Sequence, residues 1–137
     1  MPYSTSMSRR PPLSISEHTD FDDWLNATFA LQGPFTAFIV LVEIRGTDVT
    51  PLASTYVHVI GTEIDWADVT VLLAGSGRDW QGAVFFAEQD GVNGPLNAVK
   101  ARLRLQLLET EIDTNRLHIN KGQFFDPWGR RMKIEAV

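Results

Sequence analysis

The residue types that perform acid–base or nucleophilic chemistry are few and scattered in this chain. Its 137 residues include three histidines, His18, His58 and His118, and no cysteine. The lack of cysteine excludes thiolate nucleophiles, disulfides and cysteine-ligated metals. No two histidines stand at a spacing typical of metal ligands on one helix or strand, so we expect no metal site.

Two residues could nevertheless form a catalytic or ligand-binding pocket. His58 lies in a predicted strand and precedes three acidic residues within ten positions, and a histidine beside a carboxylate can act as a general acid or base. Arg78 follows the segment 75–77, whose Gly-Ser-Gly backbone amides could cradle a phosphate. Phosphate loops normally precede helices, however, and this segment precedes a predicted strand. The competing interpretation of His58 is a histidine held within a sheet.

The C-terminal segment 121–133 interleaves aromatic and basic residues. Aromatic rings that stack on bases, beside cations that hold phosphates, are typical of proteins that bind single-stranded nucleic acid. The formal net charge of −5 and the pI of about 5.1 disfavour this function. The second hypothesis is a surface for an acidic protein partner, with Phe125, Trp128, Arg131 and Lys133 as candidate residues.

The predicted long helix, residues 96–113, carries two apolar stripes. The first consists of Leu96, Val99, Leu103 and Leu107, and the second of Ala98, Ala101, Leu105, Leu108 and Ile112. A helix that lies on a sheet buries one stripe, so the second must meet another helix of the chain or the same helix of a second subunit. The homodimer hypothesis takes Ala101, Leu105, Leu108 and Ile112 as interface residues, and predicts that Leu105→Asp or Leu108→Asp yields a folded monomer.

The order of predicted elements indicates the fold class. A helix begins at Asp20 and ends before Gly33-Pro34, and two strands follow at 35–44 and 54–60. A short helix is predicted after Asp65, a buried strand at 82–88, and strands at 116–120, 123–126 and 130–136 beyond the long helix. Asp126-Pro127-Trp128-Gly129 favours a type I turn. We therefore predict an α+β fold: a single mainly antiparallel sheet of about five to six strands, two or three helices packed on one face, and a C-terminal β-hairpin.

Domain organisation and location follow from length and composition. Residues 1–19 are rich in Ser, Thr and Pro without an apolar period and predict a flexible N-terminal arm, whereas residues 20–137 predict a single α+β domain. The longest apolar run, residues 37–42, is far shorter than the roughly 20 residues that cross a bilayer. Without a signal peptide pattern either, we expect a cytoplasmic protein that does not bind membranes.

From these features we expect a non-catalytic homodimeric interaction or regulatory module that needs no cofactor. The alternative is a small-molecule-binding protein or an enzyme with a pocket near His58 and Arg78. A binding module requires an exposed apolar or charged patch. An enzyme requires a concave pocket that brings a histidine or a carboxylate together with other polar groups.

Overall fold

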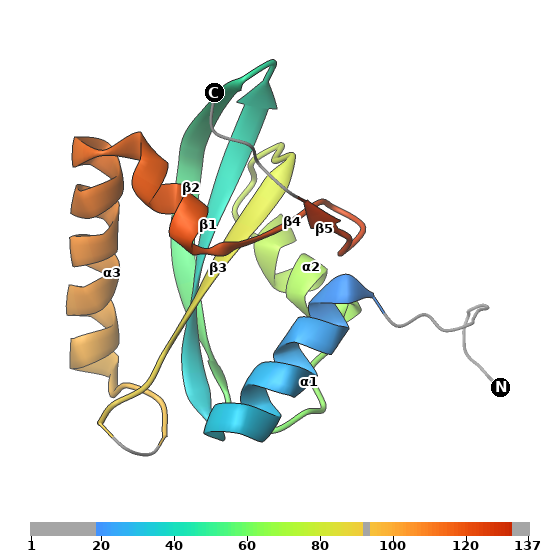
Figure 1. Ribbon diagram of the computed structural model, residues 1–137, viewed down its shortest axis with the longest axis vertical. Helices are drawn as coiled ribbons and strands as arrows, with labels where there is room; N and C mark the ends of the chain where they lie inside the picture. Colours follow the sequence, from blue (N-terminus) through green and yellow to red (C-terminus); the bar gives the residue numbers. More distant parts are fainter. Residues whose placement is uncertain (1–18, 92–93, 133–137) are drawn as a thin grey trace, which may run out of the picture.

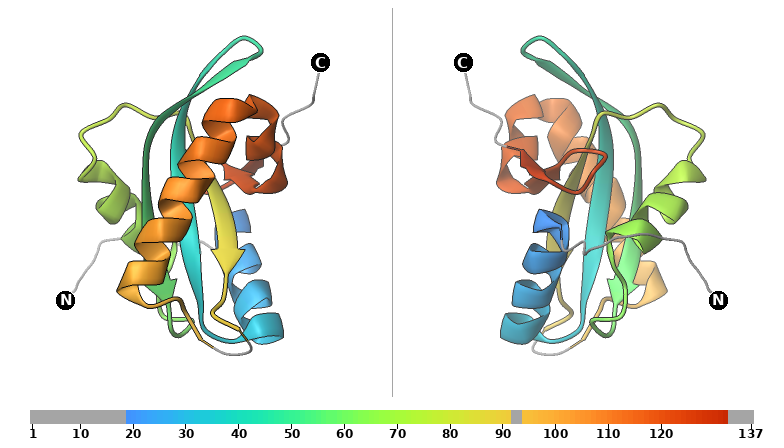
Figure 2. Two further views of the ribbon diagram at one scale, coloured as in Figure 1. Left: turned by 90° about the vertical axis from the view of Figure 1, so that its left-hand side faces the viewer. Right: turned by 90° about the vertical axis from the view of Figure 1, so that its right-hand side faces the viewer.

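The computed structural model describes residues 19–91 and 94–132, which form one five-stranded antiparallel sheet with helices on both faces (Figures 1 and 2). The strands lie in the order β2-β1-β3-β4-β5. Their bounds are β1 Phe35–Arg45, β2 Asp48–Val59, β3 Gly82–Glu88, β4 Gln123–Phe125 and β5 Arg131–Met132. The helices are α1 Asp20–Gln32, α2 Trp66–Ala74, α3 Ala98–Thr114 and the 3₁₀ helix η1 Arg116–Lys121.

A long hairpin of β1 and β2 forms one side of the sheet. It turns at Gly46, whose φ of 61° is a conformation that glycine adopts without strain. β1 is central and buried on both faces over most of its length, whereas β2 is the edge strand. The pairing shifts between Leu41 opposite Ala53 and Val42 opposite Pro51, so β2 carries one extra residue there. Such a bulge, together with a proline, is typical of an edge strand.

The face beneath α1 and α2 has an aromatic core. The ring of Phe21 lies 4.9 Å from the rings of Trp66 and Phe85 and 5.4 Å from that of Phe125. Trp66 also donates its indole N–H to the carbonyl of Pro127 at 3.0 Å. Tilted and edge-on aromatic contacts of this kind stabilise a core beyond simple area burial.

Hydrogen bonds of the backbone and of one carboxylate join α1, α2 and the β4–β5 turn on this face. Asp22 completes a capping box with Thr19 at the start of α1 and accepts the N–H of Trp66, the first residue of α2, at 2.9 Å. Phe21 donates its N–H to the carbonyl of Gly129 at 3.0 Å. Gly129 has φ +79°, and a Cβ there would lie 2.8 Å from the Trp66 ring. Both helix N-termini and the β4–β5 turn are therefore fastened together.

The opposite face is covered by α3 and η1 and has a mainly aliphatic core. Its buried residues include Val40, Val42, Val84, Leu108 and Ile112. The chain reaches this face by way of Leu96, whose N–H donates to the buried Oγ1 of Thr36 at 2.9 Å. In Figure 2, α3 crosses one side of the sheet while α1 and α2 lie behind it.

The α+β class, the single antiparallel sheet and the C-terminal hairpin are confirmed. The packing of all helices on one face is wrong, because β1 is apolar on both faces and each needs its own cover. The predicted strand 116–120 is the 3₁₀ helix η1, which begins where Asn115 accepts the N–H of Leu117 and which buries Ile119. α1 begins at Asp20 and is capped by Thr19. α3 begins at Ala98, two residues after the predicted start, and is capped by Asn97.

Two further expectations concern the ends of the chain and membranes. The predicted N-terminal arm lies outside the described residues except for Thr19. Among the helices within 19–91 and 94–132, none combines the length and apolar character that a membrane span requires.

Candidate functional site

The two faces of α3 are reversed relative to the sequence-based assignment. Ala101, Leu108 and Ile112 are buried at 0%, 7% and 2% exposure against the sheet, and Leu105 packs half-buried against the same cluster. The assignment of these four residues to a subunit interface is therefore corrected: they belong to the core of the chain. The two stripes of α3 are similarly apolar, and the structure buries the one that contains Leu108 and Ile112. In this orientation of α3, Arg104 forms an ion pair with Glu88 on β3, and Glu109 accepts a hydrogen bond from Ser54 on β2.

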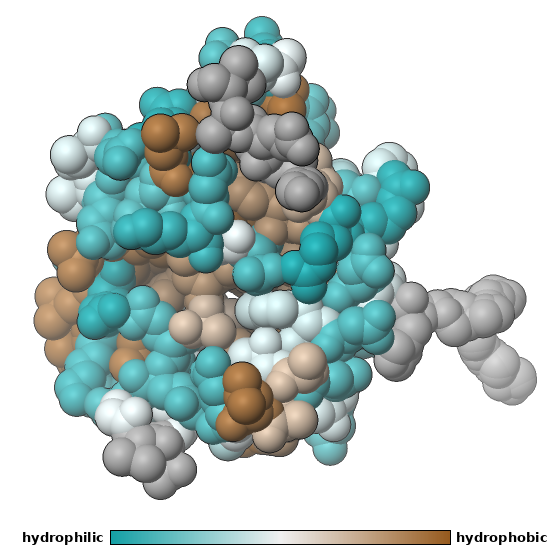
Figure 3. All heavy atoms as spheres, in the orientation of Figure 1, coloured by the Kyte–Doolittle hydropathy of each residue, from teal (hydrophilic) through white to brown (hydrophobic). Residues whose placement is uncertain are grey.

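The opposite stripe of α3 projects away from the sheet. Val99, Leu103 and Leu107 are 62%, 59% and 50% exposed. At 100° per residue, the uncharged polar residues Gln106, Thr110 and Thr114 fall on the same side. We call these six residues the α3 outer band. Hydrophobic residues are visible along the α3 edge of the molecule, at the left in Figure 3, and a charge-free apolar band on a helix surface is typical of a protein contact.

Charged residues border the α3 outer band on both flanks, and on each flank the basic residues precede the acidic ones along the helix. One flank carries Arg102 near the N-terminus of the helix and Asp113 near its C-terminus. The other carries Lys100 and Arg104 first and Glu111 later. Lys100 pairs with Asp90 and Arg104 with Glu88, so both basic residues of this second flank already have partners within the chain. Nε2 of His118 lies 3.4 Å from a carboxylate oxygen of Glu111. The first flank, with Arg102 and Asp113, is therefore the clearer case of a flank that is basic at one end and acidic at the other.

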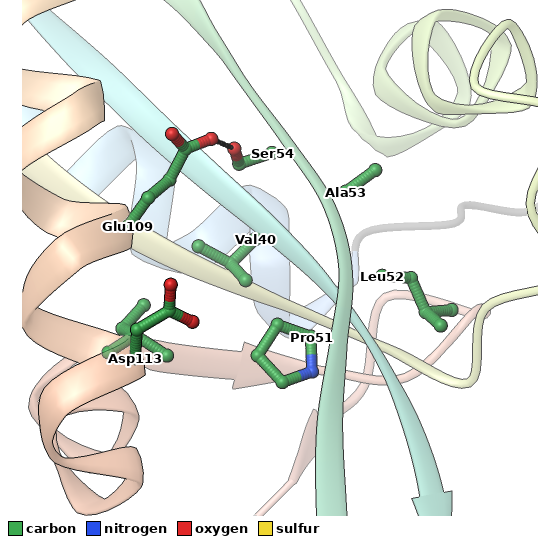
Figure 4. Close-up of a pocket in the computed structure, with 8 residues that line it drawn as sticks. Val40, Pro51, Leu52, Ala53, Ser54, Glu109 and Asp113 are labelled. Carbon is green, nitrogen blue, oxygen red and sulfur yellow. Dashed lines mark hydrogen bonds between the residues drawn. The ribbon is translucent and has the colours of Figure 1, made fainter.

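A cavity of about 280 Å³ opens between α3 and the bulged part of β2 (Figure 4). Ser54 donates its hydroxyl to Glu109 across the cavity, and Asp113 lies one helical turn further along the same wall. Val40 and Ile112 form part of the apolar lining. The pocket thus combines an aliphatic floor with two carboxylates, a lining suited to a basic group with an aliphatic stem.

A second cavity of about 380 Å³ lies on the other face of β2, beneath the C-terminus of α2. Its lining is mainly apolar and includes Leu41, Leu72 and Leu73. Ala53 and Ser54 border both cavities, so the edge strand is flanked by a pocket on each face at the same level.

His58 and Arg78 do not come together. Nδ1 of His58 lies 3.0 Å from Oγ1 of Thr36, in a hydrogen bond within the sheet. Arg78 donates to the carbonyl of Leu52 at 2.8 Å, and six strand residues, roughly 20 Å, separate Leu52 from His58. Neither residue lines either cavity. In the described residues, groups of three or more side chains that could hold a metal ion are also absent.

The predicted C-terminal surface is only partly formed. Phe125 is fully buried in the aromatic core, with the guanidinium of Arg131 5.4 Å from its ring centroid. Trp128 is 68% exposed, with the guanidinium of Arg130 5.2 Å from its ring. Lys133 lies outside the described residues. Only one aromatic side chain of the predicted set therefore faces solvent beside basic residues.

No protein-family model, curated protein or solved structure matches the chain. The edge position of β2 and its two cavities were not predicted from the sequence. The strand was predicted to begin at residue 54, whereas β2 begins at Asp48 and includes Pro51, and proline in a strand is typical of an edge or a bulge.

Proposed function

We propose that the protein is a non-catalytic interaction module that forms a homodimer through the α3 outer band. The observation that carries the proposal is the exposed stripe of Val99, Leu103 and Leu107 on a helix whose other stripe is already buried. Association would remove these three side chains from water, which is the main favourable term in most protein contacts. A cytoplasmic location is part of the proposal.

The charges on the flanks of α3 favour a second copy of the chain as the partner. When two identical helices pack antiparallel about a two-fold axis, the same flank of each lies side by side with its direction reversed. Arg102 then approaches the partner's Asp113, whereas Arg104 already pairs with Glu88 within the chain. In a parallel pair the two basic ends would meet each other, as would the two acidic ends, and like charges at such positions are destabilising. The arrangement is self-complementary only when antiparallel.

The other two hypotheses receive less support. A catalytic pocket near His58 and Arg78 would need the two side chains to share a cavity, and they are held on separate hydrogen bonds. An acidic partner at the C-terminal hairpin has Trp128, Arg130 and Arg131 to contact, where Trp128 is the one exposed large apolar side chain among the described residues of the hairpin, compared with three on α3.

The test is the solution mass of the protein by light scattering during size-exclusion chromatography, for the wild type and Leu103→Asp. We expect a dimer for the wild type and a monomer with unchanged circular dichroism for the variant, because a charge at this exposed site blocks apolar association without entering the core. The matched control is Leu31→Asp, at a leucine 84% exposed on α1, which should leave the dimer intact. A monomeric wild type would refute the proposal.

A further inference from the structure

The outer edge of β2 is open for pairing along its second half. The carbonyl of Val42 accepts the N–H of Gln81 and therefore points towards β3. Because the backbone groups of successive strand residues point in opposite directions, the N–H and carbonyl of Leu41 point towards β2. Leu41 lies opposite Ala53, which therefore pairs with β1, and its neighbour Ser54 points outward. By the same alternation, the backbone N–H and carbonyl groups of Tyr56 and His58 also face away from the sheet. No described strand lies beyond β2 on that side.

The first half of the same edge is closed. Arg116 donates to the carbonyl of Val49 at 3.0 Å and Arg78 to that of Leu52 at 2.8 Å. Pro51 lacks an N–H, and the bulge beside it interrupts the strand. Devices of this kind normally protect an edge from pairing with another chain. These protective features are confined to residues 49–52. The outward backbone groups of residues 54–58 therefore stay available for pairing with an added strand.

The two cavities flank this open stretch at its start, one on each face of the sheet. An added strand would point successive side chains alternately to the α3 face and to the α2 face. On the α3 face it meets Glu109 and Asp113 above an aliphatic floor, and on the α2 face it meets Leu72 and Leu73. Leu72, which lines this second cavity, is 45% exposed and therefore offers apolar surface to an added strand.

We propose that the β2 edge binds an extended peptide segment of a partner protein, as an added strand, with a basic side chain in the α3-side cavity and aliphatic side chains on the α2 side. Main-chain hydrogen bonds to Ser54, Tyr56 and His58 supply affinity, and the two cavities supply specificity. The basic side chain replaces the Ser54 hydroxyl as the partner of Glu109. The inference does not depend on the proposed dimer, because Glu109 and the β2 edge lie outside the α3 outer band. Asp113 alone borders both the cavity and the outer band.

The probe is a capped synthetic peptide, Val-Thr-Val-Lys-Val-Thr-Val, in which the valines share one face and the lysine lies on the other. Binding is measured by calorimetry against the wild type and against Leu103→Asp, which separates peptide binding from dimerisation. We expect saturable binding with similar affinity for both. Two further peptides serve as controls: one has glutamate in place of lysine, and one carries N-methyl groups on alternate backbone amides that would face β2. Each control should bind at least about tenfold more weakly.

Two pairs of variants locate the site on the protein. Ser54→Pro removes an outward N–H that the fold does not use, whereas Ser54→Ala keeps it and removes only the hydroxyl. We expect Ser54→Pro to abolish binding and Ser54→Ala to retain it. Glu109→Gln should weaken the lysine peptide about tenfold, whereas Glu111→Gln, on the other flank of α3, should not.

Several outcomes would overturn the inference. Equal binding of the N-methylated peptide would exclude strand addition, and equal binding of the glutamate peptide would exclude the acidic cavity. A change in the solution mass of the protein with Ser54→Pro, without peptide, would assign the β2 edge to a second copy of the chain instead. Should Ser54→Pro lose its native circular dichroism, the comparison of the three peptides on the wild type still decides the question.

Discussion

The two faces of the sheet are built for different tasks. The face beneath α1 and α2 holds an aromatic cluster, and two helix N-termini and a turn are fastened to one another through Asp22 and the backbone of Gly129. The face beneath α3 holds an aliphatic core under one long helix, which leaves a cavity beside β2 and an apolar band facing solvent. The first face is closed where the two helices meet the β4–β5 turn and borders a cavity only at the C-terminus of α2, whereas the second face leaves an apolar stripe of α3 exposed along the helix.

This difference separates stability from interaction within one small domain. Residues of the closed face make their contacts inside the chain, so substitutions there should lower the free energy of unfolding. Residues of the α3 outer band touch little within the chain, so substitutions there should change association and leave folding intact.

The sharpest contrast lies across α3 itself. Leu108→Asp places a carboxylate in the aliphatic core and should unfold the protein, at a cost of several kcal/mol. At protein concentrations low enough for the wild type to be monomeric, Leu103→Asp should change the free energy of unfolding by less than about 0.5 kcal/mol. Urea titrations of the two variants check this. A folded monomer from Leu108→Asp would restore the interface first inferred from the sequence and refute the inward orientation of this stripe.

The aromatic cluster should dominate stability. Phe21→Ala removes a buried ring that contacts Trp66, Phe85 and Phe125 and should lower the free energy of unfolding by about 3–5 kcal/mol. Leu107→Ala, on the α3 outer band, should cost well under 1 kcal/mol. Thermal and urea unfolding measure both changes. Similar losses in the two variants would mean that the outer band is part of the folding core.

The carboxylate that joins α1 to α2 should have an intermediate effect. Asp22→Ala leaves the N–H groups of Thr19 and Trp66 without their acceptor and should cost roughly 1–3 kcal/mol. The matched control, Asp68→Ala, removes only the exposed carboxylate that accepts the N–H of Asp65 in the capping box of α2 and should cost less. Equal losses would show that Asp22 acts as an ordinary helix cap without a role in joining the two helices.

The smallest expected effect concerns the charges beside the outer band. Arg102→Glu should weaken the dimer roughly tenfold by facing the partner's Asp113 with a like charge, and the further change Asp113→Arg should restore it. Sedimentation equilibrium measures the dissociation constants. Failure of the second change to restore association would contradict the antiparallel arrangement.

The sequence predicted the elements better than their spatial arrangement. Asp65, Gly33 and the Asp-Pro-Trp-Gly turn act locally, through caps and backbone conformation, and the elements they delimit are confirmed. The sides of the sheet on which helices pack depend on long-range contacts, such as Arg104 with Glu88 and Glu109 with Ser54. Two stripes of similar hydrophobicity on α3 carry no signal of which one turns inward, and so the predicted interface was placed on the wrong face.

The candidate sites show the same limit. Phe124 and Phe125 stand next to each other and therefore point to opposite faces, where each enters a different core. Composition alone suggested that aromatic and basic residues of this segment share a surface. The unpaired outer edge of β2 at residues 54–58 could not be located from the sequence, because the edge strands of a sheet are defined by the strand order of the whole sheet.

The central claim is that α3 pairs with α3 of a second copy in antiparallel orientation, and the absence of cysteine allows a direct test. A single cysteine is introduced either at Gln106, near the middle of the α3 outer band, or at Val99, near its start, and each variant is oxidised and its covalent dimer quantified. Only residues near the two-fold axis come within disulfide reach of their own copies in an antiparallel pair. We expect Gln106→Cys to cross-link and Val99→Cys not to. Efficient cross-linking of Val99→Cys, or no cross-linking of Gln106→Cys, would contradict the antiparallel pairing of α3 with α3.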